Sequence, residues 1–321
     1  MHRYLAALAA AAIALSGCAT SASGTAEETR APTQVTFVAA SPEEGAAVFS
    51  AYDEYLSILS PADISIRTQG APGATARDVG QRYATQTRAW TDAERARLTA
   101  LVARHAEVLD QLADWLPDTV LFVKGENIES GIPHTRGNAI FWGDDLPASE
   151  SGLDGLFFHE LFHVLSRESA ARHDEIYGVI GFVRCELVPP ASLAERFLSN
   201  PDAPRIQHAA PIAGGDLLVT PVLIAQPSRF DPGRTHLSQY FSVELVALRR
   251  GADGNCRVAE NAGLSQAQLT EALFARAGRN TDYIFHPEEV MADNFAQLMT
   301  GQSGPNPDVH ERLAALLGVT R

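Results

Sequence analysis

The chain has 321 residues, of which 45% are hydrophobic and 20% are charged. These fractions are typical of a folded globular protein and argue against a disordered chain. Lysine and arginine total 25 against 39 aspartate and glutamate residues, which gives a formal net charge of −14. Because nucleic-acid binding depends on a positively charged surface, this balance argues against a nucleic-acid partner.

The N-terminus has the pattern of an export signal. Arg3 precedes an apolar stretch, residues 5–15, that is short for a membrane span. Leu-Ser-Gly-Cys follows, ending at Cys18, and resembles the lipobox of bacterial lipoproteins. The resemblance implies a cleaved signal peptide over residues 1–17 and a lipid on Cys18 that holds the protein at the cell envelope without a spanning helix. Ala19 favours the outer membrane, facing the periplasm; a plain signal peptide with an incidental cysteine is the alternative.

Residues 18–45 consist mainly of Ser, Thr, Ala, Glu and Pro, with few large apolar side chains. This composition predicts a solvated tether between the lipid and the folded part. Apolar residues at helical spacing then predict one helix over residues 46–59 and another over residues 92–116. The second helix starts with a capping-box pattern at Thr91 and ends before Pro117.

The middle of the chain predicts two short strands and a long helix. Residues 119–123 and 138–142 have the composition of β-strands between turns rich in Gly and Pro. Ser151 and Asp154 are candidate caps for a helix over residues 155–171. These elements place residues 46–175 in the N-terminal part of the folded domain.

The amino-acid composition changes after this helix. Residues 176–260 contain runs of Val, Leu, Ile and Phe broken by Pro and Gly, which predict a β-rich insertion. Residues 261–321 return to helical periodicity and form a helical C-terminal part. Its helices are predicted at residues 265–277, 287–299 and 308–317. The fold class predicted from these elements is α+β.

The insertion contains the two remaining cysteines, Cys185 and Cys256. An even pair in an oxidising compartment predicts a possible single disulfide. Two separate buried thiols are the alternative.

Residues 159–163 read His-Glu-Leu-Phe-His inside the predicted long helix. Residues four apart share a helix face, so His159 and His163 can present ring nitrogens to one metal ion. Glu160 lies one step around the helix, where its carboxylate can reach a water on the ion and act as a general base without being a ligand. The apolar flanks indicate a buried helix, and a pair of structural histidines is the alternative.

A catalytic zinc usually takes a third protein ligand, and several positions fail as its source. Ser166 and Ser169 stand where the metzincin pattern requires Gly and His, which excludes that family. His173 lies ten residues beyond His163 and would be about 15 Å away on a continuous helix.

Residues 286–293 read His-Pro-Glu-Glu-Val-Met-Ala-Asp and supply a better source. The proline suits the first helical position, so Glu289 and Asp293 stand four apart on one face. Residues 159–163 have the pattern His-Glu-x-x-His, written HExxH. Together with this motif, residues 286–293 resemble the paired motifs of the gluzincins, the thermolysin- and neprilysin-like zinc peptidases. The resemblance implies that Glu289 is the third zinc ligand and that Asp293 orients His159. The alternative is that the two glutamates only complement a helix N-terminus.

A rival third ligand is Asp174. Residues 174–178 resemble the Asp-x-x-Tyr-Gly element of aspzincins, although Arg172 and His173 replace the accompanying Gly-Thr. The choice between Glu289 and Asp174 remains open at this point.

Two further roles are expected in a zincin. Residues 138–142 stand where zincins place an edge strand that binds an extended peptide. A donor to the developing oxyanion is also needed, and the sequence does not choose among its candidates. These candidates are Tyr283, His286, Tyr240 and His236.

The resemblance implies a zincin-like domain with a β-rich insertion between the HExxH helix and the helix of Glu289. The expected function is zinc-dependent hydrolysis of a peptide or protein substrate at the bacterial envelope. Two alternatives stay open, a non-catalytic zinc-containing lipoprotein and a zinc hydrolase of a non-peptide amide. Intact Glu160 argues against the first, because a structural site has no use for that carboxylate. The sequence leaves the cleavage preference and oligomeric state open.

Replacement of Cys18 by Ser tests the expected anchor. Acylation needs the thiol, and no other segment of the sequence is apolar enough to span a bilayer. Cys18→Ser should therefore release the protein from the membrane fraction, as measured by cell fractionation and immunoblotting. A variant that still sediments with membranes would require a different anchor.

Overall fold

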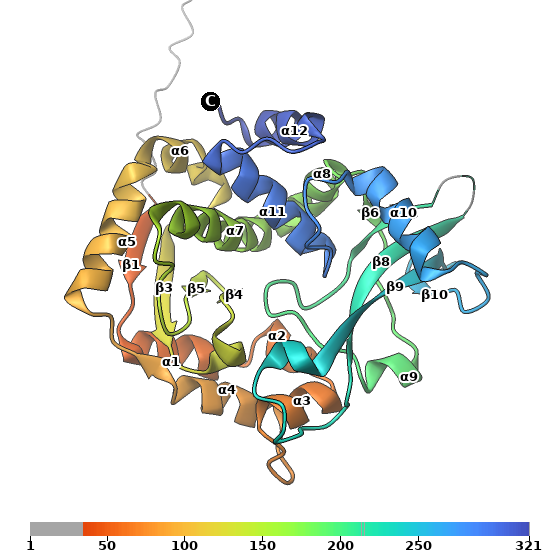
Figure 1. Cartoon of the computed structure of the whole chain (residues 1–321), viewed down its shortest axis with the longest axis horizontal. Coiled ribbons are helices and arrows are strands. Elements are labelled where there is room, and N and C mark those ends of the chain that lie inside the picture. The colour runs from red at the N-terminus through yellow and green to blue at the C-terminus, as the bar shows by residue number, and fades with distance from the viewer. Residues whose placement is uncertain (1–34, 213, 215, 321) are drawn as a thin grey trace, which may run out of the picture. The chain divides into compact units, whose positions relative to one another are not determined.

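The computed structural model describes residues 35–212, 214 and 216–320, in which helices are combined with two five-stranded sheets (Figure 1). The helices are α1 (Pro42–Ser50), α2 (Glu54–Ile58), α3 (Pro61–Arg67), α4 (Ala76–Ala84), α5 (Asp92–Arg104), α6 (Ala106–Gln111), α7 (Glu150–Glu168), α8 (His173–Gly178), α9 (Ala191–Ala194), α10 (Gln266–Ala277), α11 (Pro287–Thr300) and α12 (Pro307–Leu317). The strands are β1 (Thr36–Ala39), β2 (Thr87–Arg88), β3 (Thr119–Gly125), β4 (His134–Arg136), β5 (Ala139–Phe141), β6 (Val183–Arg184), β7 (His208–Pro211), β8 (Leu217–Ala225), β9 (Phe241–Arg250) and β10 (Cys256–Val258). The mixture agrees with the predicted α+β class.

The predicted signal peptide and the predicted lipidation site Cys18 lie outside the described residues. Among the helices of the described part, none has the length and apolar character needed to cross a membrane.

The first sheet has the order β1-β3-β5-β4, and β2 pairs with β3. β1 and β5 run parallel to β3, whereas β4 runs antiparallel to β5. β5 is therefore an inner strand, and the expectation that residues 138–142 form the edge strand is wrong. Gly137 has φ +56°, a conformation that glycine adopts easily, and it allows the tight reversal by which β4 covers β5. The edge strand next to β5 is β4.

The predicted tether extends too far. β1 and the start of α1 fall within residues 18–45, and β1 pairs with β3 from Thr36 opposite Thr119. The Phe37 ring stacks on Phe122, with ring centroids 5.7 Å apart. A four-residue, partly buried strand contributes too few apolar residues to stand out from the surrounding composition.

Two predicted helices are broken. Residues 46–59 contain most of α1 and all of α2, because Ala51 is extended and ends α1, and Asp53 caps α2 by accepting a hydrogen bond from Leu56 N at 3.0 Å. Residues 92–116 contain α5, α6 and a short 3₁₀ turn, with a break at His105. The His105 ring lies against Phe158, with centroids 4.7 Å apart. Apolar spacing continues through both breaks, so periodicity alone does not reveal them.

α7 and α11 pack against each other and form the centre of the domain (Figure 1). α7 starts earlier than predicted, because Ser149, rather than Ser151 or Asp154, caps it by accepting a hydrogen bond from Gly152 N at 3.1 Å. The ring of Phe295 in α11 lies 5.6 Å from that of Phe162 in α7. Burial of such rings is worth about 1.5–3 kcal/mol each, and it fixes the two helices side by side.

The second sheet is antiparallel throughout, with the order β10-β9-β8-β7-β6. All five strands lie between residues 183 and 258, inside the range for which the sequence predicts a β-rich insertion. Cys185 and Cys256 form a disulfide with a Cα–Cα distance of 5.4 Å, which joins the start of this sheet to its end.

The disulfide should stabilise the insertion. It joins residues 71 positions apart, so it restricts the unfolded chain strongly. Replacing both cysteines by Ser should lower the free energy of unfolding by about 2–4 kcal/mol. Urea unfolding followed by circular dichroism measures the loss, and a reductant should shift the wild-type midpoint but not that of the variant. Equal midpoints for the two proteins would contradict the expectation.

Candidate metal centre

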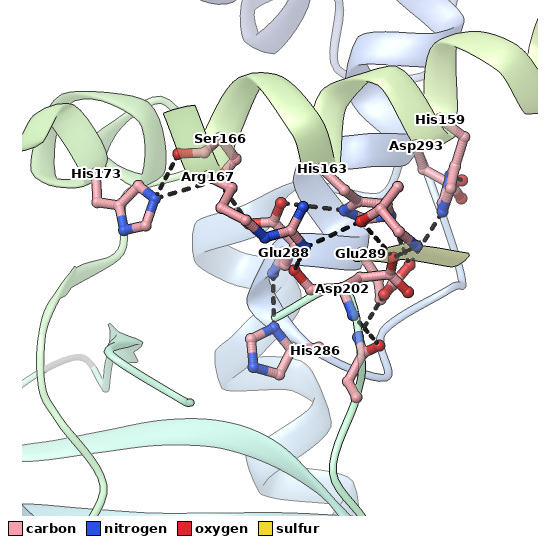
Figure 2. Close-up of polar contacts among 12 residues, drawn as sticks. His159, His163, Ser166, Arg167, His173, Asp202, His286, Glu288, Glu289 and Asp293 are labelled. Carbon is pink, nitrogen blue, oxygen red and sulfur yellow. Dashed lines mark hydrogen bonds and ion pairs between the residues drawn. The ribbon is translucent and has the colours of Figure 1, made fainter. Parts of the chain in front are cut away.

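The packing of α11 on α7 brings three predicted ligands together (Figure 2). His159 Nε2 lies 3.0 Å from Glu289 Oε2, and His163 Nε2 lies 3.6 Å from the same oxygen. Ligand atoms of these three side chains all lie within 4.8 Å of one another, so they could hold a metal ion. Two imidazole nitrogens and a carboxylate oxygen suit a divalent transition metal.

Asp293 orients His159. Its Oδ1 lies 2.9 Å from His159 Nδ1, and the Thr281 hydroxyl donates to its other oxygen. A hydrogen bond from Nδ1 fixes the ring and leaves Nε2 as the metal-facing nitrogen. The structure thus places Asp293 where the gluzincin resemblance expects it.

His163 has its own buried partner, Glu288, which sequence reasoning missed. Glu288 Oε1 lies 3.0 Å from His163 Nδ1, while Ser166 and Tyr177 donate to Glu288 Oε2. Burial alone would raise the pKa of Glu288, but the hydrogen bond from His163 and its charge lower the pKa below the usual value. The adjacent acidic pair at the start of α11 was the available signal, since Glu288 contacts Nδ1 of His163 while Glu289 faces Nε2 of both histidines.

Glu289 is held in its position by Asn200, whose Nδ2 donates to Glu289 Oε1 at 2.6 Å. This contact leaves Oε2 to face the two histidines. Burial opposes ionisation of Glu289, but the charge of His163 and the hydrogen bond from His159 lower its pKa to about 2. Glu289 is therefore ionised at neutral pH and can act as a negatively charged metal ligand.

Glu160 lies beside this cluster and has an unpartnered oxygen. The residue is buried, and its Oε2 has no hydrogen-bond partner among the described residues. Burial raises the pKa of its carboxyl to about 8, and the nearby charge of Asp202 contributes. Since an unpaired buried polar atom costs about 1–3 kcal/mol, its retention here fits a group that contacts a metal-site ligand or substrate.

Asp202 is a second residue that sequence reasoning missed. A carboxylate oxygen of Asp202 lies within 4.8 Å of ligand atoms of both Glu160 and His163. Asp202 comes from the loop after α9 in the insertion, far from either motif. No local pattern marks it.

Asp174 lies apart from the centre. Its side chain is 61% exposed, and it pairs with Arg184 at 2.9 Å and His208 at 2.8 Å. Neither metal cluster found in the described part of the chain includes it. His173 is also absent from these clusters, but for a different reason than expected: α7 ends at Glu168, and His173 turns back to within 2.9 Å of Ser166 O.

Only one of the four candidate oxyanion donors lines the cavity at this centre. Tyr283 does so, with its ring centroid 5.8 Å from that of His159. Tyr283 is 38% exposed, and its partial desolvation and the charge of Glu289 raise its pKa above the ordinary value. The others are engaged elsewhere. His286 caps α11, Tyr240 donates to Asp231 O at 2.6 Å, and His236 caps the short turn Leu237–Tyr240.

The cavity beside the cluster has a volume of about 970 Å³. His159, Glu160 and Glu289 lie in its wall, together with apolar side chains from the second sheet, from α7 and from the loops after α9 and before α11. These apolar residues include Leu156, Leu198, Leu223, Phe241, Val243 and Phe285. A volume near the upper end of the usual range for ligand pockets provides room for an extended molecule next to the ligand atoms.

The candidate centre thus consists of two histidines, a carboxylate and a neighbouring glutamate with one unpartnered oxygen. Comparison of the chain with models of protein families, with curated proteins and with solved structures finds no match.

Proposed function

We propose that the protein is a zinc-dependent peptidase. The observation that carries the proposal is the convergence of His159, His163 and Glu289 on one point, with the unpartnered Glu160 carboxylate beside it and a cavity in front. Three protein donors with an accessible side are typical of catalytic zinc, whereas structural zinc usually takes four.

A zincin-like architecture is part of this proposal. It is supported by the HExxH helix α7, by the carboxylate from α11 and by the antiparallel edge strand β4 of the first sheet. The export signal and Cys18 support a lipid-anchored location at the bacterial envelope. The proposed substrate is a peptide or protein of that compartment.

Each residue then has one task. His159, His163 and Glu289 hold the zinc, which when bound polarises a carbonyl and makes water more acidic. The positive charge of the bound zinc would oppose the effect of burial on the pKa of Glu160 and favour its carboxylate form. In that form Glu160 would accept the proton of the attacking water and return it to the leaving amine. Tyr283, whose raised pKa keeps its proton, donates to the oxyanion. Asp293 and Glu288 hold the two imidazoles in place.

Glu160→Gln separates the base from the ligands. The variant should keep its zinc but lose activity by at least about 100-fold, because the amide cannot accept a proton. A peptide-library cleavage assay, run beside a peptidoglycan assay, together with metal analysis measures both quantities. Glu168→Gln, on the exposed end of the same helix, is the matched control and should keep full activity. Full activity in Glu160→Gln would exclude the mechanism.

The third ligand is tested by zinc affinity. Glu289→Ala should weaken zinc binding by orders of magnitude, and Asp293→Ala by about 10–100-fold. Asp174→Ala removes an exposed carboxylate outside the centre and should leave the affinity unchanged. Titration with a competing chelator compares the variants. Loss of zinc in Asp174→Ala together with retention in Glu289→Ala would transfer the ligand role to Asp174.

A further inference from the structure

The loop of residues 198–202, here called the strap, connects the insertion to the candidate centre. Its first residue donates from Leu198 N to Leu223 O in β8 at 2.9 Å. Its middle residue, Asn200, donates to Glu289 at 2.6 Å. Its last residue, Asp202, contacts the edge strand β4 of the first sheet. The strap therefore lies between the two sheets and beside the proposed ligands.

The Asp202 carboxylate accepts a hydrogen bond from a backbone amide of the edge strand β4. Thr135 is the middle residue of β4, and alternate residues of a strand direct their backbone groups to opposite sides. Thr135 N donates to Asp202 Oδ1 at 2.6 Å, so it points away from β5 and toward the unpaired edge of the sheet, which the strap covers because Thr135 is fully buried. The Thr135 hydroxyl donates to the same oxygen at 2.9 Å. In the three-residue strand β4, the amide that an added strand would use is taken.

Arg167 reinforces this closure from α7. It stands one helical turn after His163, and its NH2 group donates to Asp202 O at 2.8 Å and to Thr135 Oγ1 at 3.0 Å. Its NH1 group donates to Gly137 O at 2.7 Å, in the turn between β4 and β5. One guanidinium thus joins the strap, the edge strand and the helix of the proposed ligands.

The closed edge is adjacent to the proposed chemistry. The Asp202 carboxylate that accepts from Thr135 also lies within 4.8 Å of ligand atoms of Glu160 and His163. An extended peptide normally binds to a sheet by pairing its backbone with a free edge strand. Such a peptide would have to displace Asp202 before it could pair with β4 near Glu160.

We propose that Asp202 determines substrate length: it keeps long extended chains off β4 and leaves the cavity of about 970 Å³ to short peptides. The proposal rests on the peptidase function above. A short peptide enters the cavity and reaches Glu160 without pairing along β4. A long chain needs the Thr135 amide for its binding and does not obtain it while the strap is closed.

A pair of substrates tests the proposal. A tetrapeptide and a dodecapeptide with the same scissile bond are cleaved by zinc-loaded wild type, Asp202→Ala and Asp202→Asn. Wild type should favour the tetrapeptide, and Asp202→Ala should raise the dodecapeptide-to-tetrapeptide ratio of kcat/KM by about tenfold, the effect of one recovered hydrogen bond. Asp202→Asn keeps an acceptor oxygen and should keep the wild-type ratio. Asp174→Ala, an exposed aspartate outside the cavity, is the matched control with unchanged activity.

The dodecapeptide-to-tetrapeptide ratio of kcat/KM is independent of any effect of Asp202 on the chemical step, because both substrates have the same scissile bond. An unchanged ratio in Asp202→Ala, or equal cleavage of both peptides by wild type, would overturn the proposal. Hydrogen exchange at the Thr135 amide gives a readout without turnover. The amide should be protected in wild type and Asp202→Asn and exchange faster in Asp202→Ala; fast exchange in wild type would also overturn it. If neither peptide is cleaved while the exchange pattern holds, the peptidase proposal fails and the closure of β4 stands.

Discussion

The contact between α7 and α11 is the interaction on which the rest of the site depends. Phe162 and Phe295 fix the two helices side by side, and the polar faces they leave carry the histidines and the acidic residues. The free energy gained by burying these apolar side chains offsets the unfavourable free energy of burying Glu288 and Glu289 beside them. Each buried charge is in turn compensated, Glu288 by His163 and Glu289 by both histidines. A shift of one helix by a single turn would separate every one of these pairs.

The parts of the centre that could be predicted from the sequence are those that one helix encodes. His159 and His163 share a face of α7 by their spacing, and Glu289 and Asp293 share a face of α11 in the same way. The structure brings these two pairs together, as the gluzincin resemblance implies, and the assignment of zinc chemistry to them stays a proposal. Local periodicity also predicted most of the long helices and the strand-rich insertion, because burial of one face leaves a repeating apolar pattern.

The remaining features depend on contacts between distant segments. Asp202 and Asn200 reach the centre from the insertion, and nothing in their neighbourhood in the sequence marks them. The edge strand was assigned to residues 138–142 instead of β4, since strand order is a property of the whole sheet. The breaks at Asp53 and His105 arise from a cap and a ring contact that interrupt an otherwise continuous apolar pattern. Tertiary contacts therefore determine the strand order and the helix breaks, which apolar periodicity alone does not predict.

The two histidines differ in their access to solvent. The side chains of His159 and Asp293 are 14% and 30% exposed, whereas those of His163 and Glu288 are 1% and 2% exposed. An ion that entered the proposed centre through the cavity would therefore meet His159 first and His163 last. Exchange of the ion with the solution would start by release from His159, while His163, enclosed with Glu288, would hold it longest. If the centre binds a metal as proposed, the ion would enter and leave at one imidazole and be retained at the other.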